Sequence, residues 1–272
     1  MDRSSAERTN RHVHEVDVES APVDPAADLA LALDLARVAG ERLLALRAEW
    51  PAGEPGGGAA GDRAAQEVLA AGLSAARPAD AVLSEEALDL PGRDRADRVW
   101  IIDPLDGTRE FAEGRDDWAV HVALWERAAD GLTVGAVALP GRGLVLGSAD
   151  IAVPRRARGP LRIAVSRTRP PAAAVAVAEE LGAELIPMGS AGAKVAAVVL
   201  GEVDAYVHAG GQYQWDSAAP VAVALAAGLR ATRLDGSRLR YNDPDPALPD
   251  LLVARTEYFD AVLAAANRKT DR

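Results

Sequence analysis

One stretch of the chain, Trp100–Phe111, constrains the fold more than any other. In it an apolar, β-branched run ends in two carboxylates, Asp103 and Asp106, which a proline and a leucine separate. The proline fixes φ and lacks an N–H donor, and the glycine after Asp106 permits a backbone conformation that most residues avoid. The stretch therefore predicts a strand, Val99–Ile102, that ends in a tight acidic turn.

Two readings of this turn are open. Carboxylates that face one point repel each other unless a cation lies between them, and oxygen ligands of this kind suit a divalent metal. The alternative is a solvated Asp-Pro…Asp-Gly turn, which is common in surface loops. The turn alone does not choose between them, so the residues before and after it must decide.

Composition excludes several classes of protein. The chain has 272 residues, of which 49% are hydrophobic, so it can form one large globular domain or two smaller ones. It has no Cys, which rules out disulfides and thiolate zinc sites, and no apolar run long enough for a membrane span. The N-terminus lacks the apolar segment of a secretory signal, so we expect a cytoplasmic protein. The net charge of −11 argues against a nucleic-acid partner.

The N-terminal part of the chain combines helical and turn signals. Residues 1–25 are polar and without periodicity, so we expect a disordered tail. Apolar residues at helical spacing predict helices over Asp28–Ala48 and Asp62–Ala76. Between them, Pro51–Gly61 is rich in Gly and Pro and predicts a loop.

Beyond the acidic turn, a strand meander leads to a connector rich in Pro, Arg and Gly, after which strands alternate with helices. This alternation is typical of an α/β layer. We therefore expect an N-terminal α+β subdomain over 26–155, which carries the acidic turn, and a C-terminal α/β subdomain over 156–272. The further expected strands are Ala81–Leu83, Ala119–Trp125, Thr133–Ala138, Gly143–Gly147, Arg162–Val165, Glu184–Pro187, Ala205–His208 and Val253–Arg255, and the further helices are Pro171–Leu181, Ala193–Leu200, Ser217–Ala227 and Phe259–Ala266.

Four acidic residues stand at the ends of expected strands or at the start of a helix: Glu85, Asp103, Asp106 and Asp216. Mg²⁺ takes about six oxygen ligands and keeps several waters, so a few carboxylates, a backbone carbonyl and a substrate phosphate suit it. Asp216 alone could simply cap a helix. The occurrence of all four in this order favours a metal site.

Other motifs are weaker. His121 lies in an apolar strand and is interpreted as a satisfied strand residue rather than a ligand. The segment Gly189–Lys194 is not a P-loop, because its lysine has the wrong offset. It predicts a strand-to-helix turn whose free N–H groups and Lys194 could meet an anion. The alternative for Lys194 is an ordinary solvated side chain.

Three segments together resemble the signatures of a known superfamily: Leu83–Glu86, Trp100–Phe111 and Trp215–Pro220. They are similar to those of the lithium-sensitive, Mg²⁺-dependent phosphomonoesterases, which include inositol monophosphatases, fructose-1,6-bisphosphatases and 3′(2′),5′-bisphosphate nucleotidases. The resemblance extends over roughly 29–259 and implies an α+β fold, the layered αβαβα sandwich of the sugar phosphatases. Within the superfamily the chain most resembles the actinobacterial CysQ-type nucleotidases, on Gly61–Ala65, Gly114–His121, Gly189–Lys194 and His208–Asp216.

The resemblance also implies roles for individual residues. Glu85, Asp103 and the Leu105 carbonyl would hold one metal ion, and Asp103, Asp106 and Asp216 would hold a second. Thr108 and Asp62 would orient a water for in-line attack on phosphorus. The residues expected to bind substrate are Gly107, Thr108, Arg109, Ser166, Ser190, Lys194 and Asp216.

The number of Mg²⁺ ions, two or three, is left open by one departure from the family pattern. Relatives often carry a Lys, a Thr and a second Asp before the helix with the water-orienting Asp. The corresponding segment here, Glu54–Asp62, lacks all three. A mobile, Gly-rich lid is the alternative interpretation of this segment.

The function implied is Mg²⁺-dependent hydrolysis of 3′-phosphoadenosine 5′-phosphate to AMP and phosphate, as in sulfate assimilation. Arg109-Glu110 resembles the nucleotidase branch, and relatives are often homodimers. Two alternatives are an inositol phosphate or fructose bisphosphate phosphatase, and a metal or nucleotide sensor without activity. The presence of Asp62 and Thr108 argues against a sensor, which needs no residues to orient a water.

Overall fold

The computed structural model describes residues 24–50, 53–149, 151–155 and 159–268. Most of the expected tail, residues 1–23, lies outside this range. The tail was expected to extend to residue 25, and this is wrong for its last two residues. Asp24 caps the first helix by accepting a hydrogen bond from the Ala26 N–H at 3.0 Å, and Pro25 is the first helical residue. Proline is favoured there because its missing N–H would have no helical partner.

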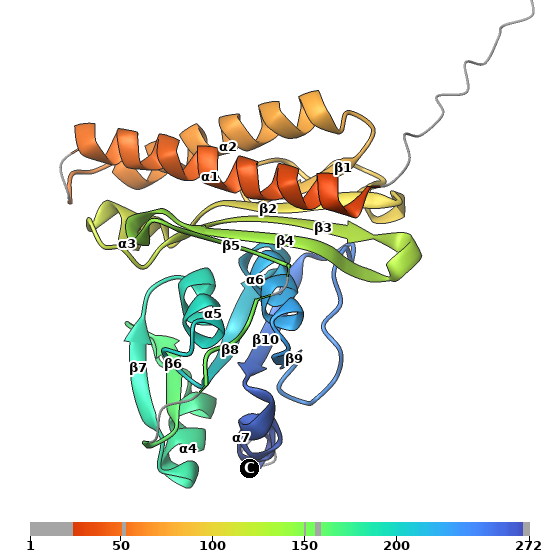
Figure 1. Ribbon diagram of the computed structural model, residues 1–272. Coiled ribbons are helices and arrows are strands. Elements are labelled where there is room, and N and C mark those ends of the chain that lie inside the picture. The colour runs from red at the N-terminus through yellow and green to blue at the C-terminus, as the bar shows by residue number, and fades with distance from the viewer. Residues whose placement is uncertain (1–23, 51–52, 150, 156–158, 269–272) are drawn as a thin grey trace, which may run out of the picture.

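The elements form five layers, as expected for an αβαβα sandwich (Figure 1). Two helices cover the outer face of a first five-stranded sheet, two more lie between the sheets, and another two cover the outer face of a second five-stranded sheet. The outer pair at the first sheet is α1 (Pro25–Glu49) and α2 (Gly57–Ala76), the middle pair α5 (Ala191–Val199) and α6 (Gln214–Ala226), and the pair at the second sheet α4 (Ala172–Leu181) and α7 (Thr256–Asn267).

The first sheet has the strand order β1-β2-β3-β4-β5. β1 runs parallel to β2, and the other neighbours are antiparallel, which confirms the expected meander. Its strands are β1 (Ala81–Ser84), β2 (Arg98–Asp106), β3 (Ala119–Glu126), β4 (Gly131–Leu139) and β5 (Leu144–Gly147), and a short helix, α3 (Thr108–Ala112), follows β2.

The second sheet has the order β7-β6-β8-β10-β9 and contains one strand that the sequence did not predict. That strand is β9, which has three residues and lies at the edge of the sheet. A segment this short carries no readable periodicity. The strands are β6 (Arg162–Ser166), β7 (Glu184–Met188), β8 (Ala205–Tyr213), β9 (Arg230–Thr232) and β10 (Ala247–Ala254).

The strand that carries the acidic turn is longer than expected. β2 continues to Asp106, and its pairing with β3 shifts register between Asp103 and Asp106. Pro104 lies inside this irregularity, where a residue without an N–H is tolerated. The prediction that the strand ends at Ile102 was therefore wrong, because the apolar run stops before the pairing does.

Both faces of β2 are buried, and this explains its unbroken apolar sequence. Trp100 and Ile102 pack in the core beneath α1 and α2, whereas Val99 and Ile101 pack in the core around α5 and α6. A third core lies between the second sheet and the helices α4 and α7. Because side chains alternate along a strand, Asp103 follows Val99 and Ile101 toward the middle layer.

The loop expected over Pro51–Gly61 is contradicted by the structure from Gly57 onward. There α2 begins, five residues before the expected start, so a lid formed by 57–61 is also excluded. A Cβ at Gly58 would lie 2.6 Å from Thr108 Cγ2, and one at Gly61 would lie 2.8 Å from Leu105 Cδ2. The glycines thus let α2 approach the acidic turn closely, and packing outweighs their low helix propensity.

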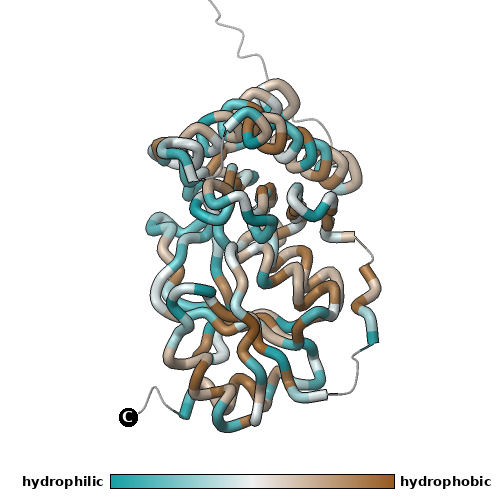
Figure 2. The backbone as a smooth tube through the Cα atoms, turned by 90° about the vertical axis from the view of Figure 1, so that its left-hand side faces the viewer, coloured by the Kyte–Doolittle hydropathy of each residue, from teal (hydrophilic) through white to brown (hydrophobic). Residues whose placement is uncertain are grey.

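The helices against the first sheet show the hydropathy that this packing requires. In Figure 2 hydrophilic and hydrophobic positions are mixed along α1 and α2, and the buried residues of α1, which include Ala32, Ala36 and Leu43, recur at helical spacing. Among the described residues, no helix combines the length and the apolar character needed to cross a bilayer.

Candidate active site

Three aspartates meet where β2 ends and α6 begins. One carboxylate oxygen each of Asp103, Asp106 and Asp216 lies within 4.8 Å of the other two. Asp103 is completely buried and Asp106 nearly so. Three carboxylates this close cannot all be ionised without a cation, so the donor set fits a divalent metal.

Asp103 offers an oxygen that the protein leaves unused. Its Oδ1 accepts a hydrogen bond from the Leu105 N–H at 3.0 Å. Its Oδ2 is buried and has no hydrogen-bond partner in the described part of the chain. An unpartnered buried carboxylate oxygen is unfavourable unless a ligand completes it, and a metal ion would do so.

Asp106 is held by the start of α5. Its two oxygens accept hydrogen bonds from the N–H groups of Ala191, at 3.2 Å, and Gly192, at 2.6 Å. The next N–H, of Ala193, is bound by Ser190 Oγ at 3.0 Å. The sequence predicted that free N–H groups of this turn would meet an anion. Two of these N–H groups meet an anion of the protein itself, the Asp106 carboxylate, and the third is capped by the neutral Ser190 hydroxyl.

Asp216 is fixed within its own helix. It is the third residue of α6, and its Oδ2 accepts a hydrogen bond from the Tyr213 N–H at 2.6 Å. Loss of hydration and the nearby Asp106 raise the pKa of Asp216 to about 7. The carboxylate is therefore oriented by the helix start, and a cation would favour its ionised form.

Glu85 lies directly after β1, which pairs in parallel with β2 next to Asp103. It is not part of the close group of three aspartates. Loss of hydration is the largest cause that raises its pKa to about 7, and repulsion from Asp216 and Asp106 adds to this. Burial, followed by repulsion from Asp106, Glu85 and Asp216, raises the pKa of Asp103 well above its usual value. Glu85 therefore interacts electrostatically with the three aspartates, although it lies outside their close group.

Thr108 and Asp62 lie together beside this cluster. Thr108 is the first residue of α3, and its Oγ1 lies 3.1 Å from Asp62 Oδ1 and 3.2 Å from the Leu105 carbonyl oxygen. Gly107 has φ of +92° and packs against Ser190 and Trp118, where no side chain fits. Loss of hydration raises the pKa of Asp62 to about 6. The structure brings this expected pair into contact.

The residues expected to bind substrate are in two different situations. Arg109 is largely exposed and donates a hydrogen bond to Thr168 Oγ1 at 3.0 Å, close to Ser166 at the end of β6. Lys194 is buried, and its Nζ donates to the Gly189 carbonyl and lies over the Tyr206 ring. The alternative of a solvated Lys194 is therefore wrong, and its ammonium group already stabilises the turn before α5.

Two residues near the site have contacts that the sequence did not indicate. The interpretation of His121 as a satisfied strand residue is wrong for its Nε2, which has no hydrogen-bond partner among the described residues. His121 is completely buried; its Nδ1 lies 3.0 Å from the Trp215 carbonyl oxygen and its Nε2 3.3 Å from Asp106 Oδ2. Glu110 is buried and pairs with Arg167 at 2.9 Å, which joins α3 to the end of β6. The strand register, which places His121 opposite Asp103, would have indicated the first.

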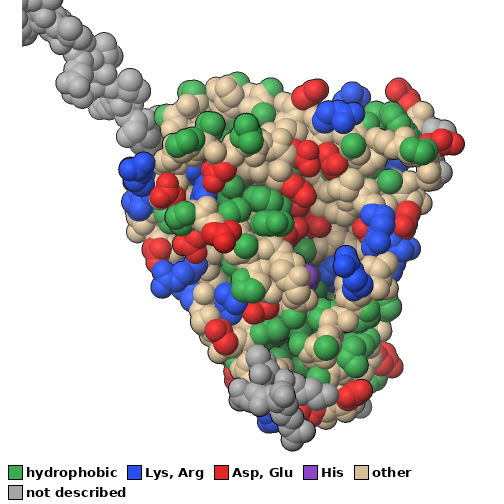
Figure 3. Space-filling model, turned by 180° about the vertical axis from the view of Figure 1, so that it is seen from behind, with side chains coloured by type: hydrophobic (Ala, Val, Ile, Leu, Met, Phe, Trp, Pro, Cys, Tyr) green, Lys and Arg blue, Asp and Glu red, His purple; other side chains and the backbone are tan. Residues whose placement is uncertain are grey.

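The surface is hollowed on the face shown in Figure 3. Acidic side chains gather along this hollow, and basic side chains border its lower part. Such an arrangement combines a region that attracts cations with one that attracts an anion.

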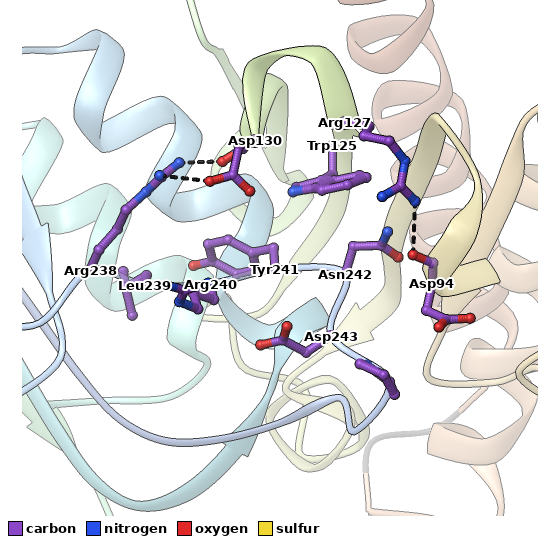
Figure 4. Close-up of a pocket in the computed structure, with 12 residues that line it drawn as sticks. Asp94, Trp125, Arg127, Asp130, Arg238, Leu239, Arg240, Tyr241, Asn242 and Asp243 are labelled. Carbon is purple, nitrogen blue, oxygen red and sulfur yellow. Dashed lines mark hydrogen bonds and ion pairs between the residues drawn. The ribbon is translucent and has the colours of Figure 1, made fainter. Parts of the chain in front are cut away.

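A separate cavity of about 200 Å³ lies near the tip of the β3–β4 hairpin (Figure 4). None of the expected site residues lines it. Its wall includes Asn242, whose N–H donates to Gln214 Oε1 at 2.6 Å. Gln214 opens α6, so this wall and Asp216 are connected through the start of one helix.

Comparisons with known proteins show the family of the chain. The model of the inositol monophosphatase family matches residues 29–271. A 3′-phosphoadenosine 5′-phosphate phosphatase of Mycobacterium bovis is 55% identical over 241 residues, which cover 84% of this chain and 88% of that protein. The 3′(2′),5′-bisphosphate nucleotidase CysQ of Escherichia coli K12 is 33% identical over 198 residues, covering 67% of this chain and 78% of that protein.

Solved structures show the same fold. The crystal structure of CysQ from Bacteroides thetaiotaomicron has a TM-score of 0.72 at 26% identity and covers 84% of this chain and 97% of its own. An IMPase of Thermotoga maritima has a TM-score of 0.73 at 21% identity, covering 90% and 98%. The match of the family model over most of the length, together with the metal-binding geometry, leads to one conclusion: the chain belongs to the inositol monophosphatase family.

Proposed function

We propose that this protein is a Mg²⁺-dependent phosphatase that hydrolyses 3′-phosphoadenosine 5′-phosphate to AMP and phosphate. The observation that carries the proposal is the contact of Thr108 Oγ1 with both Asp62 and the carbonyl of Leu105, which lies between Asp103 and Asp106 in the acidic turn. The relatives above 50% identity that carry the name of this phosphatase support the choice of substrate.

The acidic residues would hold the ions in two groups. Asp103, Asp106 and Asp216 would ligate one ion, and Asp103, Glu85 and the Leu105 carbonyl a second. When bound, Mg²⁺ neutralises phosphate charge and makes a ligated water more acidic. A third ion would lack the Lys, Thr and second Asp that relatives often carry. The segment that would bear these residues is also helical from Gly57 onward.

Thr108 and Asp62 would prepare the attacking water. Thr108 Oγ1 can hold the water in line with the phosphorus, while Asp62 Oδ1 accepts the proton that passes along this pair. The raised pKa of Asp62, about 6, leaves the carboxylate ionised at neutral pH yet basic enough for this task. A sensor protein would gain nothing from such a pair.

Arg109 and Ser166 would contact the nucleotide beyond the reacting phosphate. Arg109 is exposed on α3 and donates a hydrogen bond to Thr168, which lies two residues after the end of β6. Its guanidinium suits a second phosphate group. Ser190 and Lys194 would act through the shape and charge of the turn before α5, and Gly107 through its close packing against Ser190. Cytoplasmic location and a homodimeric state remain predictions from the sequence.

The test is a substrate comparison. Purified protein is assayed for phosphate release from 3′-phosphoadenosine 5′-phosphate, inositol 1-phosphate and fructose 1,6-bisphosphate, with Mg²⁺ or with EDTA. We expect Mg²⁺-dependent turnover of the nucleotide that is inhibited by Li⁺ and absent in Asp103→Asn. Equal or faster turnover of either sugar phosphate would contradict the nucleotidase assignment. Metal binding without any turnover would favour a sensor.

A further inference from the structure

The imidazole of His121 lies between Asp106, at the end of β2, and the backbone at the start of α6. Its Nε2 is 3.3 Å from Oδ2 of Asp106, at the end of β2. Its Nδ1 is 3.0 Å from the carbonyl oxygen of Trp215, the residue before Asp216 in α6. Since a carbonyl oxygen only accepts, Nδ1 is the donor in the second contact.

Gly192 makes this position of the ring possible. A Cβ at residue 192 would overlap His121 Nε2 and would lie 2.9 Å from the Ala119 Cβ. The N–H of Gly192 donates to the same Asp106 oxygen, at 2.6 Å, that His121 Nε2 faces. The absent side chain therefore lets the helix start and the imidazole approach one carboxylate from two sides.

The backbone that His121 holds also orients Asp216. The Trp215 ring stacks on Tyr213 with ring centres 4.8 Å apart, and the Tyr213 N–H donates to Asp216 Oδ2. Fixing the Trp215 carbonyl thus fixes the turn from which the Asp216 carboxylate projects.

The contacts of His121 are poorly explained by stability alone. Its Nε2 is buried and has no hydrogen-bond partner among the described residues, which is unfavourable for a folded protein. An apolar side chain would fill the same space without this penalty. The ring is better explained by what it touches, namely one metal-binding carboxylate and the backbone of another.

We propose that His121 is a positioning residue of the metal site, which holds the start of α6, and with it Asp216, while its ring packs against Asp106. This inference rests on the proposed metal-dependent function. Groups that orient metal ligands in this way typically contribute about 10- to 100-fold to metal affinity or activity.

The test measures metal binding directly. Mn²⁺, which prefers the same oxygen ligands as Mg²⁺, is titrated into the full-length protein and followed by electron paramagnetic resonance. We expect His121→Leu to weaken Mn²⁺ binding about 10-fold or more. His121→Asn should bind nearly as well as the wild type, because its amide nitrogen can replace Nδ1 as donor to the Trp215 carbonyl.

Gly192→Ala provides a second variant that leaves the histidine in the sequence. Its methyl group should displace the ring and weaken Mn²⁺ binding, and the loss should shrink when His121→Ala removes the ring. Unchanged Mn²⁺ affinity in His121→Leu would overturn the proposal, as would equal losses in the Leu and Asn variants. A wild type that binds Mn²⁺ but hydrolyses no phosphate ester would contradict the proposed function and leave the role of His121 intact.

Discussion

Thr108 Oγ1 lies 3.1 Å from Asp62 Oδ1, although the two residues are 46 positions apart in the chain. The contact joins the first turn of α3 to the second turn of α2, beside the acidic cluster. It places a hydroxyl and a carboxylate where a water could be oriented toward phosphorus. A site that only stores metal has no use for this pair.

Removing either partner should therefore lower turnover more than metal binding. We expect Thr108→Ala and Asp62→Asn each to reduce kcat about 100-fold or more, which is the scale of positioned proton transfer. Mn²⁺ affinity should stay within a few-fold of the wild type. Thr108→Ser keeps the hydroxyl and should retain most activity. Losses of metal affinity that match the losses of kcat would contradict this division of roles.

Gly58 of α2 should affect the position of Thr108 in the Thr108–Asp62 pair. Ala is a better helix former than Gly by about 1 kcal/mol, so Gly58→Ala would stabilise an isolated helix. Here the added Cβ would lie 2.6 Å from Thr108 Cγ2, and the expected result is displacement of Thr108 and a lower kcat.

The double variant Gly58→Ala/Thr108→Ser tests this explanation. Serine lacks Cγ2, so the contact at 2.6 Å disappears and the nearest remaining atom is the carbonyl oxygen of residue 108, at 3.3 Å. The kcat should therefore recover toward that of Thr108→Ser alone. If Gly58→Ala is fully active, or if the serine fails to restore turnover, the close packing of α2 on Thr108 does not control the reaction.

The glycines at the start of α2 also show where sequence reasoning fails. The meander and the later strand–helix alternation follow local periodicity and were predicted well. The start of α2 was not, because three neighbouring glycines normally signal a loop. Here Gly57 lies against Trp50 and Gly58 against Thr108, where a Cβ would come within 2.9 Å and 2.6 Å of these side chains. Local signals cannot reveal a contact between residues so distant in the chain.

The residues of the acidic site were likewise predicted only in part from the sequence. Asp103 and Asp106 were found because their spacing is local. The importance of His121 depends on the pairing of β2 with β3, which brings it opposite Asp103. Its contact with Trp215 depends in turn on α6, and neither relation can be read from the residues around His121.

The raised pKa values of the cluster predict how the metal-free protein responds to pH. Glu85 and Asp216 have pKa values of about 7 when folded, against about 4 for unfolded carboxyl groups. Between these values the folded state binds more protons, so the free energy of unfolding falls as pH rises. In EDTA we expect a lower Tm at pH 8 than at pH 6.

Mg²⁺ should reverse this trend. Metal binding requires ionised carboxylates and releases protons, so the gain in Tm on adding Mg²⁺ should be larger at pH 8 than at pH 6. Asp216→Asn should reduce both effects, because it removes one of the raised groups. A Tm that is independent of pH in EDTA, or a Mg²⁺ gain that is larger at the lower pH, would show that burial and the neighbouring carboxylates do not raise the pKa values of Glu85 and Asp216.

Two glutamines near the start of α6 allow a matched test of what holds Asp216 in place. Gln214 is almost completely buried; its Oε1 accepts from the Asn242 N–H at 2.6 Å, and its Nε2 donates to the Asp245 carbonyl at 3.2 Å. Gln212 is also buried, but neither atom of its amide has a hydrogen-bond partner in the described ranges.

We expect Gln214→Met to lower the free energy of unfolding by about 1–3 kcal/mol, because it leaves the buried N–H of Asn242 without an acceptor. Gln212→Met, which removes an amide with no partner, should be neutral or stabilising. Both are measured by urea unfolding in EDTA, with Mn²⁺ binding as a second readout. Gln214→Met should also weaken Mn²⁺ binding, since it loosens the loop that anchors the helix start of Asp216. Equal destabilisation by both substitutions would mean that the hydrogen bonds of Gln214 do not anchor α6.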